Sequence, residues 1–222
     1  MGIFEIIGPS MIGPSSSHTA GACRIGWAAH HLLGERACRA RIQLHGSFLA
    51  TGDGHGTKEA IVAGLLGMVP DDELLIRSRE LAAAQNFEIT FEPIDLGPQA
   101  HPNSAKIILE GATHKLTLVA SSVGGGSISV EEIDGLPVSF PGTLEALVFW
   151  HHDTSGFLAR ITAVLACVQV NVATIHTSRV ERGENAITVI EIDGHLPEEV
   201  PNLFKIIPAV ERLVVLPPLP GF

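Results

Sequence analysis

Cysteine is scarce in this sequence, whose 222 residues include only Cys23, Cys38 and Cys167. The three are far apart, and no CxxC pair occurs. Disulfide frameworks, zinc ribbons and self-sufficient iron–sulfur sites all need clustered cysteines, so the spacing argues against each of them. We therefore expect three buried, reduced thiols and no metal site held by this chain alone.

Basic clusters and long apolar runs are also lacking. The formal net charge is -10, which disfavours nucleic acid because binding to it depends on Lys and Arg neutralising phosphates. No apolar run approaches the roughly 20 residues that a membrane span requires. The opening MGIFEIIGPS has no basic region typical of a signal peptide. With 45% apolar and 17% charged residues, the sequence predicts a globular, cytoplasmic protein.

The sequence pattern divides the chain into two domains, 1–143 and 144–222. Pro141 and Gly142 interrupt the pattern at the boundary. The first domain mixes helices and strands, with a loop at TGDGHGT and a helix capped by Thr57. Its expected helices are 19–33, 57–68 and 72–84, and its expected strands are 40–50, 87–91, 105–110, 115–121, 127–133 and 136–140.

The second domain has a different pattern, which predicts the order βαββαβ. Its expected strands are 144–151, 172–180, 185–193 and 208–216, and its expected helices are 155–168 and 197–207. Phe157, Ile161 and Leu165 share one face of the first helix. This order is typical of the ferredoxin-like fold, an antiparallel sheet with two helices on one side, so the overall fold class is α+β.

The motif IGPSSSHTAG at 12–21 is the first candidate site. Ser15, Ser16, Ser17 and His18 lead into a predicted helix, whose free N–H groups and partial positive charge suit a carboxylate or phosphate. An ordinary helix cap within a polar loop is an equally simple interpretation.

The motif LHGSFLATGDGHGT at 44–57 is the second candidate. His55 lies in a Gly-rich loop between a strand and a helix, where an imidazole can accept a proton near neutral pH. A turn with solvated histidines is the alternative. In SSVGGGS at 121–127, Gly124, Gly125 and Gly126 form either a hairpin turn or a backbone nest for an anion.

The second domain holds a third candidate. Gly156 in HHDTSGFLARI lies at a helix entrance, and Asn171 in QVNVATIHTSR begins the next strand. Free N–H groups near Gly156 could bind a carboxylate, and Asn171 could accept a hydrogen bond from an ammonium. The alternative is a capped helix in a small domain.

Taken together, IGPSSSHTAG, SFLATGDGHGT and SVGGG resemble the beta subunit of iron–sulfur-dependent L-serine dehydratases of the bacterial two-chain form. The resemblance extends over essentially the whole chain. The middle of the first domain resembles the allosteric-substrate-binding fold, and residues 144–222 resemble an ACT domain, a module that binds amino acids at paired interfaces. Asp53 departs from the resemblance, since a basic residue is expected in that loop.

The resemblance implies dehydration of L-serine to pyruvate and ammonia. It implies His55 as base, His18 beside the substrate or cluster, and Ser15, Ser16, Ser17, Ser47 and Gly124–Gly126 around the substrate carboxylate. It assigns a 4Fe–4S cluster to a partner alpha subunit, which completes the active site. It also implies homodimerisation through the ACT domain, with an amino acid, plausibly L-serine, bound near Gly156 and Asn171.

Two other functions are weighed against this one. A purely regulatory amino-acid sensor is supported by the second domain but not by the histidine motifs of the first. A phosphate- or nucleotide-binding enzyme is disfavoured, because SSVGGGS lacks both the GxGxxG pattern and the Lys of a phosphate loop.

Overall fold

The computed structural model describes residues 10–221 and divides them into two compact units. The first unit extends to Asp134 and also includes the chain from Leu219 onward, whereas the second comprises Gly135–Pro218. The boundary expected after residue 143 falls between strands β6 (Leu136–Phe140) and β7 (Glu145–His152) of the second unit. Across residues 10–221, no helix is long and apolar enough to cross a membrane.

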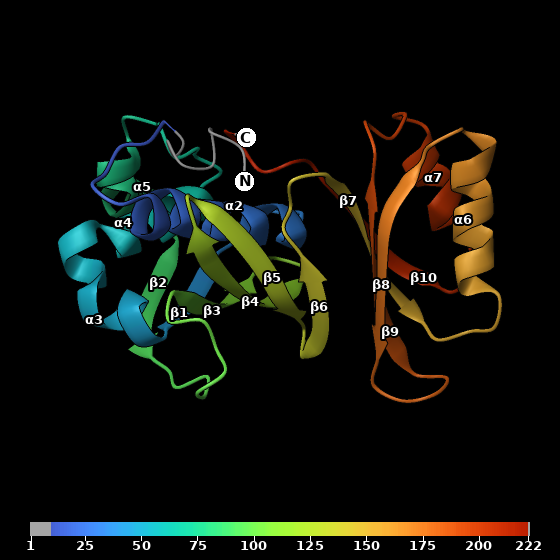
Figure 1. The fold of residues 1–222 in the computed structure, drawn as a ribbon, viewed down its shortest axis with the longest axis horizontal. Helices are drawn as coiled ribbons and strands as arrows, with labels where there is room; N and C mark the ends of the chain where they lie inside the picture. Colours follow the sequence, from blue (N-terminus) through green and yellow to red (C-terminus); the bar gives the residue numbers. More distant parts are fainter. Residues whose placement is uncertain (1–9, 222) are drawn as a thin grey trace. The chain divides into compact units, whose positions relative to one another are not determined.

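The first unit is built on five neighbouring strands in the order β2-β1-β3-β4-β5 (Figure 1). β1 and β2 run parallel, and the remaining neighbours are antiparallel. Buried apolar side chains such as Ile42, Ile107 and Leu118 alternate along these strands, as expected for a sheet with one covered face. The strands are β1 (Arg39–Leu44), β2 (Glu88–Pro93), β3 (Ser104–Glu110), β4 (Lys115–Gly124) and β5 (Ser127–Ile133).

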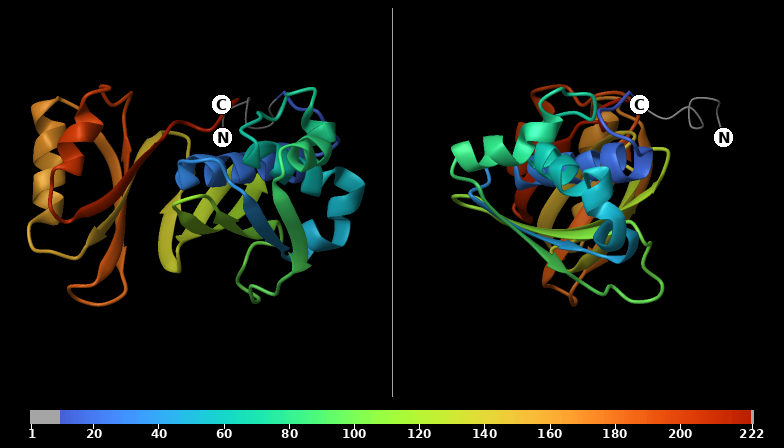
Figure 2. Two further views of the ribbon diagram at one scale, coloured as in Figure 1. Left: turned by 180° about the vertical axis from the view of Figure 1, so that it is seen from behind. Right: turned by 90° about the vertical axis from the view of Figure 1, so that its left-hand side faces the viewer.

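Helices cover one face of this sheet (Figure 2). A six-residue π-helix, η1, continues directly into α2, and α2 packs closely on α4. A Cβ added to Gly26 would collide with the backbone oxygen of Ile61, and one on Gly64 with that of Cys23. This close crossing fixes η1 relative to α4. The helices are η1 (Ser16–Gly21), α2 (Ala22–Leu33), α3 (Gly46–His55), α4 (Thr57–Leu65), η2 (Leu75–Arg77) and α5 (Ser78–Ala84).

Two expectations are wrong here. The strand expected to reach residue 50 ends at Leu44, and residues 46–55, which include most of the expected TGDGHGT loop, form helix α3. The N–H groups of Ser47 and Phe48 donate to the carbonyl oxygen of Pro102, and Phe48 is fully buried. Thr57 does not cap α4 either. Gly56 takes that place at φ 68°, and the buried hydroxyl of Thr57 has no hydrogen-bond partner. The single helix expected at 72–84 is instead η2 followed by α5.

The second unit confirms the ferredoxin-like prediction. From β7 onward its element order is βαββαβ, its sheet order is β10-β7-β9-β8 with antiparallel neighbours, and its helices lie on one face (Figure 1). Phe149, Phe157, Ile161 and Phe204 belong to its core. The elements are β6 (Leu136–Phe140), β7 (Glu145–His152), α6 (Phe157–Cys167), β8 (Val172–Arg179), β9 (Asn185–Ile192), α7 (Val200–Lys205) and β10 (Val210–Leu216).

Candidate functional site

Two histidines from separate motifs meet in the first unit. His18 lies on η1, and His55 is the last residue of α3. Their ring centroids are 4.9 Å apart, and the ring planes are tilted by 39°. The hydroxyl of Thr19 donates to the backbone oxygen of His55 at 3.3 Å, which ties η1 to the end of α3. The structure therefore brings together two of the residues that the sequence singled out.

His18, like His55, is half-buried, and it faces two hydroxyl groups. Its Nε2 atom lies 3.2 Å from Ser47 Oγ and 3.1 Å from Thr51 Oγ1, and its ring meets Phe48 edge-on. Burial lowers the pKa of His18 from its ordinary value of 6.5, and repulsion from His55 lowers it further. A hydrogen bond at Ser47 opposes these effects. His18 is accordingly neutral at neutral pH.

His55 is held through its Nδ1 atom, whereas His18 makes its contacts through Nε2. Its Nδ1 atom lies 2.9 Å from the backbone oxygen of Thr51, one helical turn earlier. A carbonyl oxygen can only accept, so Nδ1 carries a proton, and in the neutral imidazole Nε2 presents a lone pair. A neutral imidazole held in this way can act as a base at Nε2.

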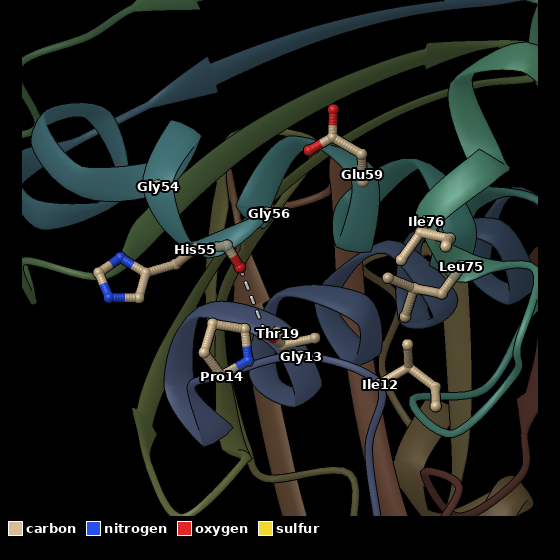
Figure 3. A pocket seen from close by; sticks show the side chains of 10 residues that line it. All are labelled: Ile12, Gly13, Pro14, Thr19, Gly54, His55, Gly56, Glu59, Leu75 and Ile76. Carbon is tan, nitrogen blue, oxygen red and sulfur yellow. Dashed lines mark hydrogen bonds between the residues drawn. The ribbon is translucent and has the colours of Figure 1, made fainter.

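A cavity of about 170 Å³ lies beside His55 but on its backbone side. Figure 3 shows the His55 ring pointing away from the side chains of Glu59, Leu75 and Ile76. Neither His18 nor Ser47 is part of the lining. The space next to the two imidazoles is therefore distinct from this small cavity. The lining consists of Ile12, Gly13, Pro14, Thr19, Gly54, His55, Gly56, Glu59, Leu75 and Ile76.

The three serines before His18 have different positions. Ser15 caps η1, because its Oγ accepts from the backbone N–H of His18 at 3.2 Å. This bond uses a lone pair and leaves the hydroxyl proton of Ser15 available. Ser16 and Ser17 are half-buried in the first turn of η1, at the N-terminal end of a helical segment that continues through α2. Free backbone N–H groups belong to that end of the segment.

The turn Gly124–Gly126 connects β4 and β5, and all three of its glycines have positive φ. Its partner is Arg24 of α2, whose Nη1 atom donates to the oxygen of Gly126 at 2.6 Å. Close by, η1 approaches β4 so tightly that a Cβ on Gly21 would collide with Ser122 Oγ. The glycine turn thus adjoins the η1–α2 segment at Arg24, and the neighbouring strand β4 adjoins it at Gly21.

In the second unit, Gly156 and Asn171 lie at opposite ends of α6. Gly156 caps its N-terminus at φ 80°, and Asn171 follows its C-terminus. The side chain of Asn171 donates to Asp193 Oδ2 at 2.6 Å, which places a carboxylate beside it. An 11-residue helix spans about 16 Å at 1.5 Å per residue. Within one domain the two residues are therefore too far apart to contact one small ligand.

The cysteines only partly follow the prediction. All three are free, and Cys23 is buried, where desolvation raises the pKa of its thiol to about 12. Cys38 and Cys167 are exposed, so the expectation of burial is wrong for both. Over residues 10–221, no group of three or more His, Cys, Asp or Glu side chains could hold a metal ion.

Two residues at this site were missed in the sequence. Thr51 contacts both histidines, and Arg24 holds the glycine turn. The signal for Thr51 is its spacing, because Ser47, Thr51 and His55 repeat every four residues along one helix face. No comparable pattern marks Arg24, which donates to the backbone carbonyls of Gly126, Pro220 and Gly221.

Comparison with known proteins finds similar proteins over most of the chain. Residues 2–88 match the family described as Serine dehydratase beta chain. The probable L-serine dehydratase beta chain of Bacillus subtilis (strain 168) is 40% identical over 209 residues, which cover 92% of this chain and 94% of that protein. The L-serine dehydratase beta chain of Peptoniphilus asaccharolyticus is 35% identical over 210 residues, covering 94% and 93%.

A more distant similarity is to the D-3-phosphoglycerate dehydrogenase of Methanocaldococcus jannaschii, 26% identical over 133 residues, which cover 60% of this chain and 25% of that enzyme. Fold and site define a two-unit α+β protein with a histidine pair in its first unit and a ferredoxin-like second unit. The chain belongs to the family of L-serine dehydratase beta chains.

Proposed function

We propose that this chain is the beta subunit of a two-chain L-serine dehydratase that converts L-serine to pyruvate and ammonia. In this proposal it supplies the base and the carboxylate-binding groups of an active site shared with an alpha subunit. The observation that carries the proposal is the histidine pair, in which His55 presents a bare Nε2 and His18 contacts Ser47. The beta-chain relatives supply the substrate class.

The reaction begins with removal of the Cα proton of serine, for which His55 Nε2 is the proposed acceptor. The electron pair left on Cα forms the Cα–Cβ double bond as the Cβ–O bond breaks and the hydroxyl departs. The resulting aminoacrylate tautomerises to an imine, which water hydrolyses to pyruvate and ammonia. A positioned base of this kind contributes roughly 10²–10⁴-fold to the rate.

The substrate carboxylate is assigned to the hydroxyl groups around His18. Ser15, Ser16 and Ser17 lie at the N-terminal end of the η1–α2 segment, and Ser47 lies beside the His18 ring. Hydroxyl and backbone N–H donors there would stabilise the negative charge of the carboxylate without a Lys or Arg. Gly124, Gly125 and Gly126 border the same segment and are proposed to close the site at its other end.

The departing hydroxyl needs an electrophile that the described part of this chain does not offer. Cys23 is a buried thiol with a raised pKa, and residues 10–221 contain no metal-binding cluster of side chains. We assign this role to a 4Fe–4S cluster carried by the alpha subunit, which would act as a Lewis acid on the hydroxyl. This chain holds the carboxylate and accepts the proton.

The second unit is proposed to be an ACT regulatory domain that pairs with the same domain of another beta subunit. Since Gly156 and Asn171 are separated by the length of α6, pairing is what would let the two residues face one amino acid. The N-terminus of α6 would bind the carboxylate, and Asn171 with Asp193 would bind the ammonium. L-serine is the proposed ligand.

The test is to co-express the chain with an alpha subunit, purify the complex anaerobically and measure pyruvate formation from L-serine. His55→Ala is expected to lower kcat by about 10²–10⁴-fold while KM stays within severalfold. His114→Ala, at an exposed turn, is the matched control and should retain full activity. Purified without its partner, the chain should be colourless, iron-free and inactive.

Turnover by His55→Ala close to the wild-type rate would show that another group takes the proton. A complex that binds L-serine but forms no pyruvate would instead favour the alternative function, a regulatory amino-acid sensor without a catalytic role. The ferredoxin-like second unit is the observation that keeps this alternative in view.

A further inference from the structure

We propose that Thr51 is a positioning residue that fixes where both site histidines carry their protons and thereby leaves the Ser47 hydroxyl proton for the substrate carboxylate. The inference rests on the proposed function, which assigns the carboxylate to Ser47 and the base to His55. Thr51 contacts both histidines. Its side chain contacts His18, and its backbone oxygen contacts His55.

The argument begins with the single hydroxyl proton of Thr51. Its Oγ1 atom lies 2.9 Å from the backbone oxygen of Ser47, one helical turn earlier, and this acceptor has no proton of its own. The Thr51 proton is therefore committed to Ser47 O, and Thr51 Oγ1 can only accept from other neighbours. At 3.1 Å, the Nε2 atom of His18 must then be the donor.

This assignment determines the tautomer of His18. A neutral imidazole carries one ring proton, so a proton on Nε2 leaves Nδ1 bare. His55 has the opposite arrangement, because its Nδ1 donates to the backbone oxygen of Thr51 at 2.9 Å. Thr51 thus holds a proton-bearing Nε2 on His18 through its side chain and a bare Nε2 on His55 through its backbone.

The tautomer of His18 determines which hydrogen bonds Ser47 can make. Its Oγ atom lies 3.2 Å from His18 Nε2 and 3.3 Å from Thr51 Oγ1. If Nε2 were bare, Ser47 would donate its only proton to His18. Because Nε2 carries a proton directed at Thr51 and Ser47, the hydroxyl of Ser47 acts as an acceptor toward His18 and keeps its proton. Toward Thr51 Oγ1, which can only accept, Ser47 is the donor at 3.3 Å. This long bond is weaker than a charge-assisted one, so the Ser47 proton can turn to a substrate carboxylate.

The first test measures the ring protons in the isolated chain, labelled with ¹⁵N-histidine, at a pH where His18 is neutral. Nitrogen chemical shifts distinguish protonated from bare ring nitrogens. In the wild-type chain, His18 Nε2 and His55 Nδ1 are expected to be protonated. Thr51→Val removes the acceptor that requires a proton on Nε2 and leaves the Ser47 hydroxyl, which can donate or accept, so the fraction of His18 that is protonated at Nε2 should fall. Thr51→Ser, which keeps the hydroxyl, should retain the wild-type pattern.

His55 is the internal control of this experiment. Its hydrogen bond is to the backbone of Thr51, which both substitutions preserve, so its nitrogen shifts should not change in either variant. A His18 signal that stays protonated at Nε2 in Thr51→Val overturns the inference. Changes of equal size at both histidines would show that the substitution merely distorts α3, and this also overturns it.

The second test uses the two-chain enzyme and separates KM from kcat. Thr51→Val should raise KM for L-serine about tenfold, the effect of weakening one hydrogen bond to a carboxylate, while kcat stays within about twofold. Thr51→Ser should restore KM. If His55→Ala is fully active, the proposed function fails, although the nitrogen shifts still decide the role of Thr51. If KM is unchanged in Thr51→Val, the proposed effect of Thr51 on the Ser47 hydroxyl is refuted, and the assignment of the histidine protons is not.

Discussion

Arg24 offers the sharpest test of how the first unit is held together. Its side chain is fully buried, and its three nitrogen atoms donate to backbone oxygens of Pro220 at 2.9 Å, Gly126 at 2.6 Å and Gly221 at 2.8 Å. One guanidinium therefore joins α2, the glycine turn and the returning end of the chain. Burial lowers its pKa from the ordinary value, yet an arginine remains charged in proteins.

The proposed perturbation is Arg24→Met, which keeps the apolar stem and removes the three donors. A hydrogen bond from a charged group contributes about 1.5–3 kcal/mol, so three contribute roughly 4–9 kcal/mol. Relief of the cost of burying a cation returns several kcal/mol. The expected net loss in the free energy of unfolding is therefore about 2–4 kcal/mol, or roughly 4–16 °C in Tm for a chain of this size.

The assay is urea denaturation of the isolated chain, followed by circular dichroism, alongside a thermal scan. Arg36→Met is the matched control, because exposed Arg36 donates to one backbone oxygen, that of Gln85. It should change stability by less than about 0.5 kcal/mol. Removal of residues 219–222 should destabilise the chain too, and the two changes together should cost less than the sum of their separate effects, because both break the bonds of Arg24 to Pro220 and Gly221. Additive effects, or a loss below about 0.5 kcal/mol for Arg24→Met, would refute this reasoning.

Two further predictions concern pH and the second unit. Burial is the largest cause of a lowered pKa in His18, His31 and His151, so below pH 6.5 the unfolded chain binds protons that the folded chain resists. The free energy of unfolding should therefore fall between about pH 7 and pH 5, and His31→Gln should flatten that slope in urea titrations; a slope unchanged by His31→Gln would contradict the assignment. For regulation, calorimetry on the whole chain should show L-serine binding that Asn171→Ala abolishes, and sedimentation should show a dimer. A dimer that binds no amino acid would leave the second unit a structural role only, and a monomer would exclude both roles.

The second unit was the easier part to predict from sequence. Its strands alternate or run apolar between clear turns, and Phe157, Ile161 and Leu165 repeat at helical spacing, so local pattern and packing agree. The predicted ends of its elements differ from the observed ones by a few residues, as in the helix expected at 155–168 and found at Phe157–Cys167.

The first unit was predicted less well where tertiary contacts outweigh local propensity. The glycines at positions 52, 54 and 56 argue for a loop at TGDGHGT, since glycine disfavours a helix interior. The helix forms because Pro102, far along the chain, accepts from the first N–H groups of α3 and because Phe48 is buried against the core. Neither contact is visible in the local sequence.

That one misassigned segment also decided which site residues could be found. In the predicted arrangement, Ser47 belongs to a strand, and Thr51 and His55 belong to the loop that follows it, so the three residues share no face. In a helix, the three share a face, and Thr51 then lies between the base and the hydroxyl. His18 joins them because the close packing of Gly26 and Gly64 brings η1 alongside the end of α3. His18, Ser47 and His55 could be found as parts of sequence motifs. The positions of the protons on the two histidines depend on helix α3, which forms through contacts distant in the sequence.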